Sequence, residues 1–152
     1  RKAVEKNIIV KESRDIEAFY TILKNNLEIR HGVSPTHTLG ELKQLFNLFP
    51  KKIKLFSAFL DEQMIAGVVT FQINQRVLLA FYISHDECFS ELRAVNLLFY
   101  HIFEWAIKFK FQIFDFGIFT INGEPNMGLG RFKENFGASG IFRDTIELRL
   151  ES

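Results

Sequence analysis

The sequence predicts an α+β domain in which a mixed, mostly antiparallel sheet is flanked by helices. The chain has 152 residues, of which 47% are hydrophobic, so it is long enough to bury one substantial core. The apolar periodicity changes along the chain in the order helix, helix, three strands, helix, strand, helix, strand. We therefore expect a single domain over residues 13–152, preceded by a connector segment over residues 1–12 that could include a short strand.

Two helices open the predicted domain. Ser13 is a candidate N-cap for the first helix, and Gly32 is expected to end it. Thr38 and Glu41 have the spacing of a capping box at the start of the second helix, which Pro50 stops. The apolar residues at helical spacing are Ile16, Phe19, Tyr20, Leu23 and Leu27 in the first helix and Leu39, Leu42, Leu45, Phe46 and Phe49 in the second.

Three strands are expected next, over residues 52–60, 64–73 and 76–84. They are rich in Phe, Val, Ile and Leu, and only residues 61–63 and 74–75 connect them. Connections this short favour an antiparallel meander.

The second half of the chain alternates helices and strands. The longest helix is expected to begin at Ser90 and to cover the sheet. Residues 111–118 are apolar on both faces, which is typical of a strand inside a sheet. A polar loop leads into a short helix closed by Gly137, and residues 141–150 alternate as in a half-exposed strand.

Composition restricts the function classes. The 19 basic and 18 acidic residues give a net charge of +1, so we expect no DNA binding, which usually needs a basic excess. One cysteine, Cys88, is compatible with a reducing, cytoplasmic location. No apolar run approaches the roughly 20 residues of a membrane span. The chain begins with Arg1 rather than Met, which favours a piece of a longer protein.

Five short motifs follow one another along these elements. They are Arg30-His31-Gly32; Pro35 with Thr38-Leu39 and Glu41-Leu42; Ile65-Ala66-Gly67; Phe114-Asp115-Phe116-Gly117; and Gly128-Leu129 with Phe132-Lys133 and Phe136-Gly137. In this order they resemble the GNAT acyltransferase fold, and within it the FemAB-like and BioF2-like branch. The resemblance implies an acyl- or aminoacyltransferase that joins an activated acyl donor to the amine of a small molecule or peptide. It also implies a preceding GNAT-like domain, because members of this branch are often tandem proteins.

One departure from that family concerns the donor. Familiar acetyl-CoA-dependent members carry an Arg/Gln-x-x-Gly-x-Gly/Ala loop before the long helix, whose amides hold the pyrophosphate. Residues 84–91 stand at that place here, with no glycine and three acids. Acyl-CoA is therefore not expected in its usual mode, and aminoacyl-tRNA is the alternative donor that the resemblance implies. The other hypothesis is a non-catalytic domain that binds substrate or packs on a catalytic twin.

Asp115 and the Arg30-His31 pair are candidate site residues in the first part of the chain. Asp115 lies at an aromatic strand end, where it could transfer a proton, accept amides of the following loop or pair with an arginine. Arg30 and His31 follow the first helix, at the corner that borders the acceptor side in GNAT-like folds. His31 is a candidate catalytic residue and Arg30 a candidate substrate-binding residue, although a helix C-terminus favours cations irrespective of function.

Gly128, Arg131 and Lys133 are candidate substrate-binding residues on the last helix. Its N-terminal amides and one of the cations could meet a carboxylate or phosphate, whereas a solvated helix face is the alternative. His31, His37, His85, Asp86 and Cys88 match none of the usual zinc spacings, so no metal is expected.

Overall fold

The computed structural model of the chain describes residues 7–121, 123–142, 144 and 146–148. The chain divides into two compact units, Arg1–Gly117 and Ile118–Ser152, and each is described by itself. The first unit contains, in order, β1 (Ile9–Ser13), α2 (Ile16–His31), α3 (Leu39–Leu48), β2 (Ile53–Leu60), β3 (Gln63–Gln72), β4 (Val77–His85), the 3₁₀ helix η1 (Glu87–Leu92), α4 (Ala94–Lys108) and β5 (Ile113–Asp115).

The strands of the first unit form one sheet in the order β1-β2-β3-β4-β5. The pairs β1–β2, β2–β3 and β3–β4 are antiparallel, so the predicted meander is confirmed. β5 pairs with β4 in parallel, and α4 forms the crossover between them. A parallel pair needs such a crossover because the chain must return to the same end of the sheet.

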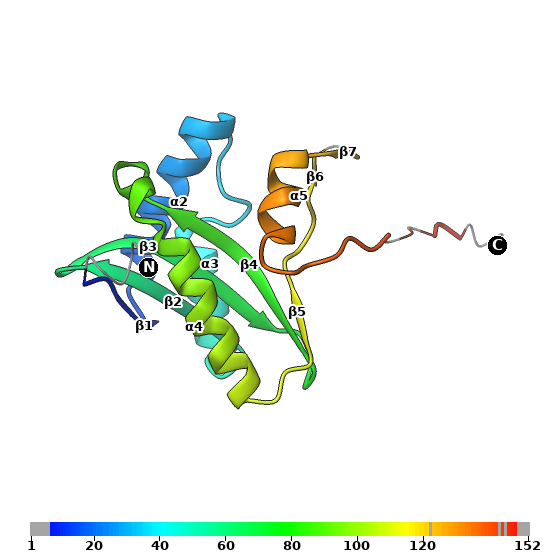
Figure 1. Cartoon of the computed structure of the whole chain (residues 1–152), viewed down its shortest axis with the longest axis horizontal. Coiled ribbons are helices and arrows are strands. Elements are labelled where there is room, and N and C mark those ends of the chain that lie inside the picture. Colours follow the sequence, from blue (N-terminus) through cyan, green and yellow to red (C-terminus); the bar gives the residue numbers. More distant parts are fainter. Residues whose placement is uncertain (1–6, 122, 143, 145, 149–152) are drawn as a thin grey trace. The chain divides into compact units, whose positions relative to one another are not determined.

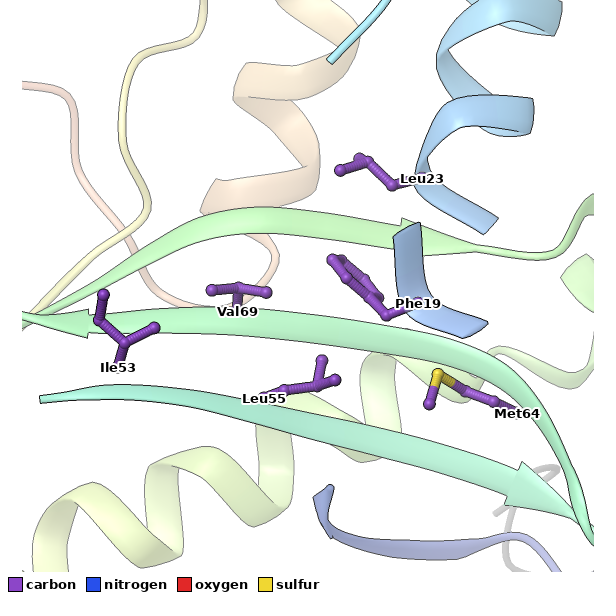
Figure 2. Close-up of a cluster of buried hydrophobic side chains, with 6 residues drawn as sticks. All are labelled: Phe19, Leu23, Ile53, Leu55, Met64 and Val69. Atoms are coloured by element: carbon purple, nitrogen blue, oxygen red, sulfur yellow. The ribbon is translucent and has the colours of Figure 1, made fainter. Parts of the chain in front are cut away.

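Helices cover both faces of this sheet. α2 and α3 lie against one face and α4 crosses the other, as Figure 1 shows. The core on the α2 side consists of Phe19, Leu23, Ile53, Leu55, Met64 and Val69, which are drawn in Figure 2. On the other side, α4 buries Leu98, Phe99 and Ile102 completely. The two apolar helix stripes therefore explain the sheet's burial on both faces.

Gly67 lets α2 approach the sheet closely. A Cβ atom on Gly67 would lie 2.4 Å from Cδ2 of Phe19, whose side chain is fully buried. That distance is far below a van der Waals contact, so no larger residue fits without a shift of α2 or of the Phe19 ring. The contact fixes the height of α2 over β3.

The start of the first unit contains the short strand that the sequence left open, and it corrects the predicted N-cap. Residues 9–12 of the expected connector belong to β1, which pairs with β2 along the edge of the sheet. Ser13 ends this strand and does not cap α2. Asp15 is the N-cap, because its Oδ1 accepts the N–H of Ala18 at 3.0 Å, while the Ser13 hydroxyl accepts the N–H of Asp15.

The elements around the crossover also differ from the prediction. The long helix begins at Ala94 rather than at Ser90, because η1 precedes it and Arg93 adopts a left-handed conformation with φ of 53°. β5 is shorter than the predicted strand and is the edge of the described sheet rather than its interior. Its apolar character comes from the α4 side, where Phe114 packs edge-on against Phe103.

The second unit contains β6 (Thr120–Ile121), β7 (Glu124–Pro125) and α5 (Met127–Glu134). Asn126 caps α5 by accepting the N–H of Leu129. Gly137 closes it as predicted, with φ of 84° and with the Gly137 and Ala138 amides bound to carbonyls of the last turn. The described residues of the expected last strand (141, 142, 144 and 146–148) form no strand, while residues 143, 145, 149 and 150 lie outside the described part.

Candidate functional site

A β-bulge in β4 is the irregular point of the sheet. Val69 of β3 pairs with Tyr82, and the next residue, Thr70, pairs with Ala80, so Phe81 is an extra residue without a partner in the ladder. Successive residues of a regular strand point to opposite faces, but a bulge changes this alternation. Phe81 and Tyr82 consequently lie on the same face of the sheet.

His37 lies against both of these residues. Its ring centroid is 5.6 Å from that of Phe81 and 6.0 Å from that of Tyr82, and it meets the Tyr82 ring edge-on. Nδ1 of His37 lies 2.9 Å from the Tyr82 hydroxyl, and the main-chain N–H of His37 donates to the same oxygen at 3.2 Å. The bulge thus builds a half-buried imidazole–phenol pair on β4.

The loop that carries His37 is held at the end that leads into α3. The hydroxyl of Tyr20, on α2, donates to the carbonyl of His37 at 3.1 Å. Thr38 then caps α3 in the predicted capping box with Glu41. The main-chain N–H and the hydroxyl of Thr38 both donate to the Glu41 carboxylate, and these bonds hold the pKa of Glu41 below its ordinary value. These contacts restrict where the imidazole of His37 can lie.

β4 and β5 pair over only a short stretch. The parallel ladder joins Val77, Leu78 and Leu79 to Ile113, Phe114 and Asp115. Residues 80–85 of β4 have no ladder partner on that side within the described sheet. The unpaired part of the strand begins beside the bulge, so an edge with main-chain donors and acceptors lies next to Tyr82.

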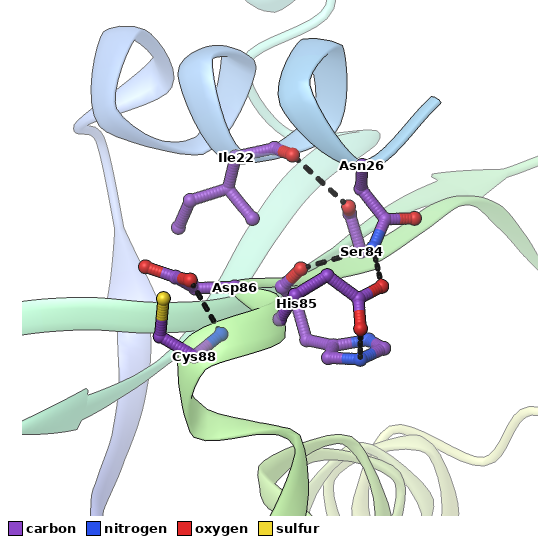
Figure 3. A network of polar contacts seen from close by, with 7 residues as sticks. Ile22, Asn26, Ser84, His85, Asp86 and Cys88 are labelled. Atoms are coloured by element: carbon purple, nitrogen blue, oxygen red, sulfur yellow. Dashed lines mark hydrogen bonds and ion pairs between the residues drawn. The ribbon is translucent and has the colours of Figure 1, made fainter. Parts of the chain in front are cut away.

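A polar network lies at the end of β4 (Figure 3). Ser84 donates to the carbonyl of Ile22, and Nδ2 of Asn26 donates to the carbonyl of His85 and to the carboxylate of Glu87. These bonds join α2 to the turn that follows the strand. They fix the direction in which the chain leaves β4.

A cavity of about 560 Å³ borders this network. α2 contributes Ala18, Ile22, Asn26 and their neighbours to its lining, and the turn after β4 contributes His85 to Cys88. Tyr20 is two residues from both Ala18 and Ile22, which at about 100° per residue places it on the opposite side of the helix. The cavity and the His37–Tyr82 pair therefore lie on different flanks of α2.

Three amides of the turn between β4 and α4 are hydrogen-bonded, two within the turn and one to β3. The N–H of Asp86 donates to the carbonyl of Ile65, and the Asp86 side chain accepts the N–H of Cys88 at 3.0 Å. The N–H of Phe89 donates to the carbonyl of Asp86. The carboxylate of Asp86 thus accepts an N–H at the start of η1 that an anionic ligand would otherwise bind.

Asp115 ends β5 and holds the chain that follows it. Its Oδ1 accepts the N–H of Gly117 at 2.7 Å, and Gly117 has a φ of 69°. This geometry agrees with the alternative that the carboxylate accepts an amide of the following loop. A role for Asp115 in proton transfer stays a prediction.

The other predicted site residues lie apart from Asp115 along the chain. Arg30 and His31 form the end of α2, which Gly32 closes in a left-handed conformation; their side chains are outside the described parts. Gly128, Arg131 and Lys133 lie in α5 of the second unit. Arg131 is exposed, whereas Lys133 is buried and its Nζ donates to the carbonyl of Ile118 at 2.6 Å. The catalytic role of His31 and the substrate-binding roles of Arg30 and of the three α5 residues stay predictions.

Sequence reasoning did not select His37 or Tyr82 as site residues. Residues 77–83 form a continuous apolar run, so the sequence gives no sign of where the alternation changes. The one available signal was the position of His37 directly before the capping box of α3. It places the imidazole in a short ordered loop but does not identify its partner.

In the described part of the chain, no helix combines the length and the apolar character that crossing a membrane requires. Within the same residues, no group of three or more His, Cys, Asp or Glu side chains is arranged to bind a metal ion.

Comparisons with known proteins agree on the type of fold. A family model described as "Acetyltransferase (GNAT) domain" matches residues 1–134. Curated proteins gave no match. A possible acetyltransferase from Clostridium difficile 630 has a similar structure, with a TM-score of 0.74 and 13% identity over 95% of this chain and 99% of that chain.

Two other solved structures are similar over nearly their whole length. An aminoglycoside acetyltransferase from an uncultured soil metagenomic sample, in complex with sisomicin, has a TM-score of 0.66 and 10% identity over 96% of this chain and 99% of that chain. A ribosomal-protein-alanine N-acetyltransferase from Brucella melitensis biovar Abortus 2308 has a TM-score of 0.65 and 12% identity over 94% and 99% of the two chains.

Proposed function

Because the chain belongs to the GNAT acetyltransferase family, we propose that it is an N-acyltransferase whose reaction takes place at the unpaired part of β4. The proposed reaction moves an acyl group from an activated donor to the amine of a small molecule or peptide. Two structural neighbours are named for amine-bearing acceptors, an aminoglycoside and a ribosomal-protein alanine, which supports this class of acceptor.

The observation that carries the proposal is the separation of β4 from β5 next to the bulge at Phe81. The ladder between the two strands ends at Leu79, and residues 80–85 continue without a partner on that side within the described sheet. An extended donor arm with amide groups can bind to such an edge as an added strand does. The acyl carbonyl is then held against main-chain N–H groups.

The chemistry needs little beyond this placement. Holding donor and acceptor together supplies much of the rate enhancement of a two-substrate reaction. A main-chain N–H that points at the acyl oxygen stabilises the negative charge that develops when the amine attacks. This explains why no strong side-chain motif is required for the reaction.

The turn between β4 and α4 does not fit the diphosphate of coenzyme A. The amides of Asp86, Cys88 and Phe89 are already bound, two of them to Asp86 itself. Two acidic side chains, Asp86 and Glu87, stand at the start of η1, where they repel an anion. We infer that the protein would recognise an acyl-CoA donor through its acyl-bearing arm and not through contacts of the diphosphate with this turn. Aminoacyl-tRNA remains the alternative donor.

The same turn favours a second candidate function. A GNAT-like domain that has no diphosphate site could bind substrate or pack on a catalytic twin domain without catalysing transfer. The two candidates differ in one respect that can be measured, namely whether the chain by itself forms an amide product.

The test uses the full chain with acetyl-CoA and with S-acetyl-pantetheine, which lacks the diphosphate. Each donor is combined with a set of amines that includes a polyamine, an aminoglycoside and an alanine-started peptide, and products are detected by mass spectrometry. We expect acetylated amine with both donors and kcat/KM values within about tenfold, roughly 1.4 kcal/mol of transition-state stabilisation. Transfer from acetyl-CoA alone would refute the inference about the turn. No product with any pair would argue against an acetyl thioester donor and leave transfer from aminoacyl-tRNA and the non-catalytic candidate.

A further inference from the structure

We propose that His37 and Tyr82 carry the proton that acyl transfer moves from the acceptor amine to the leaving group. The inference rests on the proposed function, since it assigns side chains to the same reaction. It starts from the 2.9 Å contact between Nδ1 of His37 and the Tyr82 hydroxyl, one residue after the bulge.

The contacts of the phenol oxygen indicate its direction of donation. The main-chain N–H of His37 donates to this oxygen at 3.2 Å. If Nδ1 carries the imidazole proton, it donates to the same oxygen, which then accepts two hydrogen bonds. The hydroxyl proton of Tyr82 is left to point away from His37, and Nε2 of the imidazole is left as an acceptor. We assign this tautomer to the resting pair.

The proton balance of the reaction fits this arrangement. The amine nitrogen forms a bond to the acyl carbon, and the bond from that carbon to the leaving sulfur or oxygen breaks. Nε2 of His37 takes one proton from the amine nitrogen. The resulting imidazolium gives its Nδ1 proton to the Tyr82 oxygen, while Tyr82 gives its hydroxyl proton to the leaving atom. Exchange with water then restores the resting tautomer of His37.

The position on the sheet fits the same role. Tyr82 lies in the part of β4 that has no partner on the β5 side within the described sheet, where the donor is proposed to bind. Its ring packs at the border of the core, against Phe81 and the buried cluster under α2. A side chain held in this way delivers a proton from a defined place, which general acid catalysis requires.

The experiment compares two donors with different leaving groups. S-acetyl-pantetheine releases an alkyl thiolate, which needs a proton, whereas 4-nitrophenyl acetate releases a weakly basic phenolate, which needs little help. Tyr82→Phe should lower kcat/KM by about 10²-fold or more with the thioester, the usual size of general acid catalysis, and by less than about threefold with the aryl ester. His37→Gln should lower it with both donors, because the amine must lose a proton in either case.

Tyr20→Phe is the matched control. It is the same substitution and removes one hydrogen bond to the same residue, since Tyr20 donates to the carbonyl of His37. It leaves the His37–Tyr82 contact in place, so we expect a change in kcat/KM below about fivefold and no dependence on the leaving group. The folding of each variant is compared by urea unfolding followed through Trp105 fluorescence.

The outcomes are distinguishable. The relay would be overturned if Tyr82→Phe lowered kcat/KM equally for the two donors, or if Tyr20→Phe had the same effect. Tyr82 would then serve only to anchor the loop that carries His37. Unchanged rates in Tyr82→Phe would overturn it as well. If the unmodified chain transfers acetyl groups from neither donor, the proposed function fails first and the relay fails with it.

Discussion

Replacement of Gly67 by alanine tests the close approach of α2 to the sheet. The new Cβ atom would lie 2.4 Å from Cδ2 and 2.9 Å from Cε2 of Phe19, and 3.2 Å from Cδ1 of Leu55. Phe19 and Leu55 are fully buried, so neither can turn into solvent. The contact therefore has to be relieved by a movement of the backbone or by an unfavourable rotamer.

Two opposing effects set the magnitude. Overpacking of a core costs about 1–3 kcal/mol, and this site should be near the upper end because a buried ring and a buried leucine side chain converge on it. Replacing glycine by alanine restricts the unfolded chain and contributes about 0.4–1 kcal/mol in the opposite direction. We expect Gly67→Ala to lower the free energy of unfolding by about 2 kcal/mol.

Urea unfolding followed by tryptophan fluorescence measures this change. The chain has one tryptophan, Trp105 in α4, so the signal reports on the first unit. Gly40→Ala is the matched control, because Gly40 lies in α3 and its new Cβ atom would meet only the Thr38 hydroxyl, at 4.0 Å. The control should stabilise by about 0.5–1 kcal/mol.

A double variant completes the test. Phe19→Leu makes room for the new methyl group, so Gly67→Ala should cost at least about 1 kcal/mol less in that background. A neutral or stabilising Gly67→Ala, or the same cost in both backgrounds, would refute the close contact as the reason for the glycine.

Four other predictions follow from single contacts. Thr38→Ala should destabilise by about 1 kcal/mol through the lost cap of α3 and return the pKa of Glu41 toward its ordinary value of 4.5, which an NMR titration can follow. Because the folded-state pKa of Glu41 is lowered, its contribution to stability is present above pH 4.5 and is lost as the pH falls through the folded-state value; unfolding measured against pH should therefore show a flatter acid limb in Glu41→Gln. Asp115→Asn keeps an oxygen that can accept the N–H of Gly117, so it should change the unfolding free energy by less than about 0.5 kcal/mol. Asp115→Ala removes that acceptor and should cost about 1–3 kcal/mol. A loss of activity in Asp115→Asn would indicate that the carboxylate takes part in catalysis. Lys133→Met should lower the free energy of unfolding by about 1–3 kcal/mol, because the carbonyl of Ile118 loses its donor. The control Arg131→Met replaces an exposed side chain and should be near neutral in thermal unfolding. Equal effects of the two substitutions would contradict the buried contact.

The sequence predicted best where local chemistry and burial agree. The Thr38–Glu41 capping box and the left-handed Gly32 at the end of α2 are both present. The three meander strands were predicted to within one residue at every end, because their apolar runs are long and their connections are short. These signals depend only on neighbours in the sequence, and for that reason they can be seen without the structure.

The ends of several elements depended on choices between similar local signals. Ser13 and Asp15 are both good N-caps, and β1 takes the first of them into its ladder with β2. Arg93 stops η1 and starts α4 in a left-handed conformation that glycine usually adopts, so nothing in the sequence marks that boundary. Strand pairing over long distances decided the first case, and an uncommon backbone conformation decided the second.

The His37–Tyr82 pair shows the limit of a sequence for locating a site. It depends on one unpaired residue, Phe81, within an apolar strand. Moving the bulge by one residue would turn a different side chain toward His37, and the sequence would read almost the same. The predicted candidates were charged residues near glycines, whereas the residues that the fold brings together include an aromatic one from a buried strand.

The short ladder between β4 and β5 has a consequence for the motions of the sheet. Three residues of each strand form that parallel pairing, while the antiparallel pairs beside it run the length of their strands. Opening of β5 alone breaks few ladder hydrogen bonds, so its free energy should be well below that of global unfolding. In native-state hydrogen exchange, the amides of residues 113–115 should exchange before those of β2 and β3. Separation of β5 from β4 would widen the proposed donor site while the core under α2 stays intact.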